Sequence, residues 1–168
     1  LTGVIVEMAL KMGLSRAPLS LNYPCASLAR MLGVPAGPQA VKAALDAFFA
    51  ARTGLFGAVQ VEAHEDGFCL TIPAEGVARV VSQAPAAAFL RDLIHTAQLP
   101  GATAEDLLAA FRRHSSHVHV EPVDNDEFDW LVYFEDGVPD DFRYCIDTHD
   151  GFASYHRFSK EDYEAFGF

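Results

Sequence analysis

Histidines at regular spacing are the first residues of this chain that could support chemistry. His117 and His119 are two residues apart in a stretch of alternating polarity, so on a strand their side chains project from one face. Glu121 continues the alternation, and imidazole and carboxylate groups are common zinc ligands. A zinc site needs three or four converging ligands, whereas local geometry fixes only this pair. His117 and His119 are therefore candidate metal ligands, and the alternative is a solvated strand face.

A cysteine at the start of an expected helix is the second candidate. Cys25 follows Pro24, and the dipole of a helix that begins there favours a thiolate. A Cys/His hydrolase would combine such a nucleophile with a histidine from a later strand. However, Pro-Cys-Ala-Ser matches no nucleophile signature, and a single cysteine near a helix start is commonly a small buried residue. Cys25 is the fallback catalytic residue, and we assign no other.

Acidic side chains gather in the turns of the C-terminal half. The segment that begins at Asp124 fails the template of a calcium-binding EF-hand, because Phe128 stands where a ligand is needed. The chain also lacks GxSxG, P-loop, HExxH and dinucleotide-binding motifs. We therefore expect no cofactor, and we interpret the acids as a surface for a basic protein partner. The candidate binding residues are Asp126, Glu127, Asp129, Glu135 and Asp136.

The net charge of −11 is distributed unevenly along the 168 residues. Residues 1–83 carry as many basic as acidic side chains, six of each, so the whole excess belongs to residues 84–168. Binding to nucleic acids or anionic membranes depends on Lys and Arg, so this balance disfavours both partners. The contrast also predicts two modules, residues 1–83 and residues 84–168.

The composition, with 51% hydrophobic and 21% charged residues, is that of a globular protein with its own core. Three widely spaced cysteines without a CxxC pair predict neither a disulfide framework nor a zinc ribbon. The opening run of residues 1–14 lacks the basic leader and cleavage site of a signal peptide, and no run approaches the about 18 apolar residues of a membrane helix. We therefore expect a cytoplasmic protein.

The N-terminal half is expected to contain three helices followed by a β-hairpin. Helical spacing of apolar residues predicts a helix up to Gly13, a second over 25–32 and a third from Pro38. Alternating residues at 59–63 and 68–72 flank Asp66-Gly67, a dipeptide that favours a two-residue turn. This turn would pair Ala63 with Leu70 and Val61 with Ile72. The order of elements is winged-helix-like.

The third helix of a winged helix commonly enters the DNA major groove. If Val41, Leu45 and Phe48 are buried, its outer face presents Lys42 and Asp46 together with Gln39 and either Phe49 or Ala50. The wing tip would carry Glu65 and Asp66, which repel phosphate. The N-terminal half is therefore interpreted as a winged helix without the charge of a DNA reader.

The C-terminal half is expected to contain two helices, a four-stranded antiparallel meander and a final helix. Residues 85–111 show two helical stripes, with Thr103 as the N-cap of the second. Four alternating runs follow, separated by acidic or glycine-bearing turns. Ser159 and Asp162 form a capping pair that begins the last helix. The fold class is α+β.

Several segments have an aromatic and acidic texture that resembles an uncharacterised bacterial family of unknown function. Such a resemblance implies a bacterial protein and carries no activity, ligand or catalytic residue with it. The matching segments are Ser20–Gly33, Ile72-Pro73 with Glu75-Gly76, Glu127–Cys145 and Tyr155–Phe168.

The absence of catalytic motifs and the charge asymmetry favour a non-catalytic protein-interaction module with an acidic, aromatic C-terminal half. One alternative is a winged-helix transcriptional regulator whose C-terminal half senses a ligand. A second is a hydrolase that depends on Cys25 or on a metal at His117 and His119.

Overall fold

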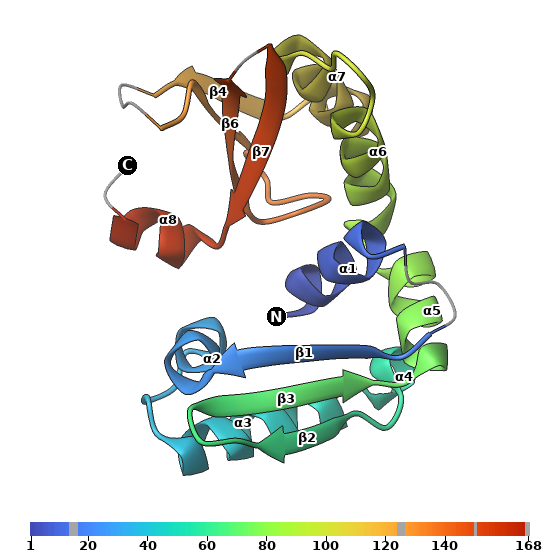
Figure 1. Ribbon diagram of the computed structural model, residues 1–168, viewed down its shortest axis with the longest axis vertical. Coiled ribbons are helices and arrows are strands. Elements are labelled where there is room, and N and C mark those ends of the chain that lie inside the picture. Colours follow the sequence, from blue (N-terminus) through green and yellow to red (C-terminus); the bar gives the residue numbers. More distant parts are fainter. Residues whose placement is uncertain (14–16, 124–126, 150, 167–168) are drawn as a thin grey trace. The chain divides into compact units, whose positions relative to one another are not determined.

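The protein, described by a computed structural model at residues 1–13, 17–123, 127–149 and 151–166, has the expected α+β fold. The described residues form eight helices and two antiparallel sheets, and the chain divides into two compact units, Leu1–Ala87 and Ala88–Phe168 (Figure 1). The elements are α1 (Thr2–Lys11), β1 (Leu19–Pro24), α2 (Cys25–Leu32), α3 (Pro38–Ala50), α4 (Thr53–Phe56), β2 (Gln60–Ala63), β3 (Gly67–Ile72), α5 (Ala74–Gln83), α6 (Ala87–Ala97), α7 (Ala104–His114), β4 (Val118–Pro122), β5 (Trp130–Phe134), β6 (Arg143–His149), β7 (Phe152–Phe158) and α8 (Lys160–Phe166).

The N-terminal unit is built on a three-stranded sheet with the strand order β1-β3-β2. Strand β3 lies in the centre and pairs antiparallel with both neighbours. Its alternate residues Phe68, Leu70 and Ile72 are buried, and α3 lies along the sheet (Figure 1). Burial of this one face of the sheet against the helices forms the core of the unit.

The hairpin between β2 and β3 exists, but the predicted register is wrong by two residues. Ala63 pairs with Phe68, and Val61 pairs with Leu70. The backbone N–H of His64 donates to the carbonyl of Gly67 over 2.8 Å, so Glu65 and Asp66 form the turn. A shift of two leaves every side chain on the same face, and alternation therefore could not distinguish the two registers.

Strand β1 explains why Gly67 is not a turn residue. Gly67 pairs with Pro24 of β1, and a Cβ atom at Gly67 would lie 2.0 Å from the carbonyl oxygen of Tyr23. Glycine is therefore required for the two strands to approach each other. No strand was expected over residues 19–24, and Gly67 was consequently assigned to the turn.

The buried stripe of α3 also differs from the predicted one. Val41 and Leu45 are fully buried as expected, but the third core position is Phe49 rather than Phe48. Phe48 is half-buried, and the guanidinium carbon of Arg52 lies 4.2 Å from the centroid of its ring. The outer face consequently presents Ala50 and not Phe49.

The C-terminal unit contains the predicted meander, with the strand order β4-β5-β6-β7 and antiparallel pairing throughout. One face of this sheet packs against α6 and α7 through buried aromatic rings. The ring of Phe89 on α6 lies 4.9 Å from Phe111 on α7 and 4.8 Å from Phe134 on β5, measured between centroids. Tyr144 on β6 completes the cluster. Such edge-to-face contacts stabilise a core beyond area burial alone.

The opposite face of this sheet is also apolar, which the alternation did not predict. Leu131 and Cys145 alternate along their strands with the core residues Val132 and Tyr144, yet both are buried on the other face, and Phe128 packs with them. Tyr163 of α8 covers this second cluster. The pKa of the Tyr163 hydroxyl is accordingly raised, mainly by burial.

Two helix starts have the predicted caps. Thr103 and Asp106 form a capping box, in which each side chain satisfies the other's backbone N–H at the start of α7. At α8, the N–H of Asp162 donates to Ser159 Oγ over 3.0 Å. These local signals are reliable because capping needs no contact from elsewhere in the chain.

Candidate functional site

The acidic candidates for partner binding do not lie together. Glu127 and Asp129 precede β5, whereas Glu135 and Asp136 follow it, and Asp126 lies outside the described residues. Asp129 and Glu135 are six positions apart along an extended chain, a span of about 20 Å at about 3.3 Å per residue. The acids therefore form two groups at opposite ends of the strand.

Asp129 has a local partner within the sheet. Its Oδ2 atom accepts a hydrogen bond from the backbone N–H of Thr148 over 2.9 Å and another from the Thr148 hydroxyl. Its own N–H donates to the carbonyl of Ile146 over 2.9 Å. Asp129 thus connects the entry of β5 to β6, and this carboxylate is less available to a partner than the acids at the other end.

The loop between β5 and β6 surrounds a polar hollow of about 340 Å³. The chain turns at Gly137, which has a φ of 71° and donates its N–H to the carbonyl of Phe134. Asp136 Oδ1 accepts the N–H of Val138 over 3.1 Å and so stabilises the turn. The charged side chains that line the hollow are Glu135, Asp136, Asp141, Arg143 and Lys160.

The charges around this loop hollow do not neutralise one another. Among the described residues, no ion pair joins its carboxylates to Arg143 or Lys160. The guanidinium carbon of Arg143 instead lies 3.9 Å from the centroid of the Tyr133 ring, a cation–π contact. Glu135 and Asp141 are exposed and available for a charged ligand or partner.

The two histidine candidates are not brought to a third ligand. The ring of His119 stacks on Tyr133 with 4.6 Å between centroids, and its Nε2 atom lies 3.1 Å from a carboxylate oxygen of Glu121. His117 is exposed and directly precedes β4. Within the described part of the chain, no group of three His, Cys, Asp or Glu side chains has the geometry to hold a metal ion. His119 instead takes part in an aromatic stack.

Cys25 begins α2 as expected and is half-buried. Its backbone N–H donates to the carbonyl of Asp66 over 3.0 Å, which connects the helix start to the hairpin tip. Cys25 and His64 line one hollow of about 370 Å³, but no hydrogen bond joins these two side chains in the described residues. The nucleophile–base contact that a Cys/His hydrolase requires is therefore not formed.

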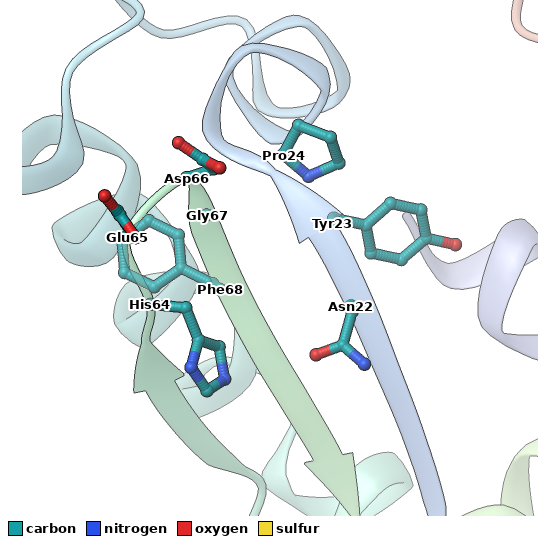
Figure 2. Close-up of a pocket in the computed structure, with 8 residues that line it drawn as sticks. All are labelled: Asn22, Tyr23, Pro24, His64, Glu65, Asp66, Gly67 and Phe68. Carbon is teal, nitrogen blue, oxygen red and sulfur yellow. The ribbon is translucent and has the colours of Figure 1, made fainter.

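A second face of the hairpin tip borders a hollow of about 390 Å³ that is mainly apolar. Figure 2 shows Glu65 and Asp66 at the tip, with His64 and Asn22 on either side of β3. The ring of Tyr23 points away from the hairpin (Figure 2), and burial, followed by the charge of Glu7, raises the pKa of its hydroxyl. This tip hollow was not predicted, because it depends on β1, which was not among the expected strands.

The outer face of α3 carries no net positive charge. Lys42 Nζ lies 2.6 Å from an Asp46 carboxylate oxygen, so the cation of this face is already paired within the helix. Gln39 and Ala50 are exposed as predicted. An adjacent i,i+4 pair of this kind leaves nothing that would attract a phosphate backbone.

Two charged clusters in the C-terminal unit were missed by sequence reasoning. Asp140 and Arg157 form a buried pair with side-chain exposures of 5% and 2%. Asp92 on α6 accepts two hydrogen bonds from Arg113 on α7, each 3.0 Å long, and His114 Nε2 lies 3.1 Å from the same carboxylate. The pKa of Asp92 is lowered, mainly by the hydrogen bonds from Arg113. No local pattern pairs residues so far apart in sequence.

No helix in the described ranges is both long enough and apolar enough to cross a membrane. Neither a curated protein nor a solved structure matches the chain. A family model does match, over residues 1–167: it represents DUF3877, a domain of unknown function with a gene description from E. rectale. The resemblance to an uncharacterised bacterial family is thereby confirmed, and the chain belongs to the DUF3877 family.

Proposed function

We propose that this protein is a non-catalytic interaction module that binds a basic protein partner through its C-terminal unit. The observation that carries the proposal is the charge of residues 88–168, which contain six basic and 17 acidic side chains. Three of the six basic side chains, Arg112, Arg113 and Arg157, are already bound to carboxylates of the same unit. The remaining acids therefore far outnumber the available cations.

The β5–β6 loop supports this proposal as the contact point. Glu135 and Asp141 are exposed charges without an ion-pair partner in the described part of the chain. Val138, in the same loop, is 60% exposed and offers an apolar contact beside them. A surface with an apolar contact inside a charged rim is typical of protein interfaces. The partner that fits is a segment with Lys or Arg next to an apolar residue.

A transcriptional regulator is the second candidate. The element order α1-β1-α2-α3-β2-β3, with β1 paired to β3, supports it because this order resembles that of a winged helix, apart from the inserted α4. The Lys42–Asp46 pair and the acidic hairpin tip speak against DNA as its ligand. We therefore propose that the N-terminal unit is a winged helix used as a scaffold or for protein contacts. A mobility shift with random duplex DNA at low salt, at micromolar protein, would contradict this assignment.

The experiment for the main proposal compares two double variants with the same change in charge. A fluorescent peptide of alternating lysine and valine is titrated with the full chain, and binding is followed by anisotropy. Glu135→Gln/Asp141→Asn should weaken binding about fivefold, since exposed ion pairs contribute about 0.2–1 kcal/mol each. The control Glu161→Gln/Glu164→Gln removes two exposed acids of α8 and should change binding by less than about twofold. Equal weakening by both variants would refute the loop as the contact point, and absence of binding would refute the proposal.

A further inference from the structure

The hairpin tip of the N-terminal unit is negatively charged, although the unit as a whole carries six basic and six acidic side chains. The strands β1, β2 and β3 contain no Lys or Arg, whereas Glu62 lies on β2 and Glu65 and Asp66 form the turn. Both turn residues are exposed, and neither side chain has an ion-pair or hydrogen-bond partner in the described residues. These two carboxylates are therefore available to an outside cation.

The tip is held in place although it is exposed. The carbonyl of Asp66 accepts the N–H of Cys25, and the N–H of His64 closes the turn on Gly67. Pro24 pairs with Gly67 across the strands and therefore lies next to the tip. The backbone that carries the two carboxylates is thus fixed by contacts with β1, β3 and α2. A preorganised site binds its ligand with a smaller entropy cost than a mobile loop does.

The hollow beside the tip combines an apolar interior with this acidic rim. It has a volume of about 390 Å³, and Pro24, Asn22 and His64 contribute to its walls. Asn22 and His64 lie on either side of β3, below the two carboxylates (Figure 2). An alkyl chain that ends in a cation matches both features, because its methylene groups pack on the apolar wall while the charge stays at the wet rim.

We propose that this tip hollow binds a lysine or arginine side chain of a partner protein, with Glu65 and Asp66 as the charge-recognising residues. In a winged helix the corresponding tip contacts the negatively charged DNA backbone, so the acidic tip has the opposite preference. The proposal goes beyond the proposed function, because it concerns the N-terminal unit and uses none of the acids of the β5–β6 loop.

A titration with two small probes tests the site. The full chain, labelled with ¹⁵N, is titrated with N-acetyl-arginine amide and, in parallel, with N-acetyl-citrulline amide, which has nearly the same shape without the charge. Backbone amide signals of His64 to Phe68 should shift with the arginine probe, with a millimolar Kd, and should shift much less with citrulline. Shifts of signals in residues 135–141 report on the β5–β6 loop separately, so failure at one site is distinguishable from failure at the other.

Variants then assign the recognition to the tip. Glu65→Gln/Asp66→Asn should weaken arginine binding about fivefold, because two exposed pairs contribute about 0.2–1 kcal/mol each. Glu62→Gln is the control, since Glu62 is an exposed acid of β2 that does not line the hollow. It should weaken binding by less than about twofold. The proposal would be overturned if citrulline caused equal shifts or if the Kd for arginine were unchanged in the double variant. It would also be overturned if the control variant weakened arginine binding as much as the double variant does. Preserved signal dispersion verifies that each variant is folded.

Discussion

Arg157 on β7 binds Asp140 through two parallel hydrogen bonds, Nε to Oδ2 and Nη2 to Oδ1, each 2.9 Å long. The Tyr144 hydroxyl donates to the same carboxylate. The guanidinium carbon of Arg157 also lies 3.5 Å from the centroid of the Phe142 ring. A pair with exposures of 5% and 2% is therefore satisfied by hydrogen bonds within the protein. This arrangement fixes the loop after β5 to strand β7.

Removing one partner of this buried pair should destabilise the protein strongly. Asp140→Ala leaves the Arg157 charge buried without its carboxylate, and such a loss costs about 3–5 kcal/mol. Urea unfolding gives the free energy. The matched control is Arg112→Ala, which breaks the exposed pair with Glu105, where 54% and 72% of the side chains are exposed, and should cost less than about 1 kcal/mol. Similar losses in both variants would show that the buried pair has no special role.

The Asp92–Arg113 pair should give stability that depends on pH. Because the native pKa of Asp92 is lowered, mainly by hydrogen bonds from Arg113, the pair stabilises above the unfolded pKa of about 3.9. That contribution is lost as the pH falls through the native pKa. Asp92→Asn should cost about 1 kcal/mol near neutral pH, the upper end for a partly exposed pair, and progressively less in acid.

Urea midpoints of the wild type and of Asp92→Asn, measured across this range, test the expectation. Arg113→Gln provides the complementary variant, since it removes the other partner of the same two hydrogen bonds. The double variant should lose little more than either single variant, because both changes break one interaction. A loss that is constant with pH, or additive in the double variant, would contradict this interpretation.

Gly76 in α5 should not tolerate a side chain. A Cβ atom there would lie 1.9 Å from the carbonyl oxygen of Phe56, so Gly76→Ala should destabilise by about 1–3 kcal/mol despite the better helix propensity of alanine. A Cβ atom at Gly54 in α4 would meet no atom within 4 Å, so Gly54→Ala is the control. Thermal unfolding should show a lower Tm for the first variant only. Unchanged Tm in both would mean that α4 and α5 can move apart without cost.

The three cysteines should differ in reactivity. Burial raises the pKa of the Cys145 thiol to about 11, so at pH 8 only about one thiol in a thousand is ionised. Cys25 and Cys69 are half-buried and free. Alkylation of the native protein should therefore modify Cys145 only after unfolding, and mass spectrometry of peptides reads the order directly. Early labelling of Cys145 would show that α8 opens under native conditions.

Local signals in the sequence predicted most of the elements. The helix 25–32, the helix from Pro38 and the four strands of the meander lie where periodicity placed them. The caps at Thr103 and Ser159 were also found. Each of these features depends on neighbouring residues, and such features are readable without the fold.

The errors have tertiary causes. The register of the hairpin was predicted from Gly67 as a turn residue. A glycine is required at this position because β1 approaches β3 closely, and not because the chain turns there. The missing strand β1 is different, because Leu19, Ser20, Leu21 and Asn22 alternate between apolar and polar, which is a local signal in the sequence. Helix α5 was not predicted, because Gly76 and several valines give its sequence a poor helix propensity. Packing against α4 overrides this propensity.

The candidate site was predicted only in part. Glu135 and Asp136 do lie together beside a hollow, and Asp141 of the same loop also lines it, but Arg143 and Lys160, which complete the lining, come from β6 and α8. Alternation placed His117 and His119 on one strand, whereas the absence of a third ligand among the described residues depends on the fold. Single-strand geometry cannot reveal which residues converge from distant parts of the chain.

The most direct test of the central claim is a map of where a basic peptide binds the protein. The ¹⁵N-labelled full chain is titrated with the lysine–valine peptide, and the amide shifts are compared along the sequence. The account predicts the largest shifts at residues 135–141, lost on raising the salt concentration and in Glu135→Gln/Asp141→Asn. Shifts spread evenly over all acidic segments, or a binding that does not respond to salt, would contradict a specific acidic docking loop.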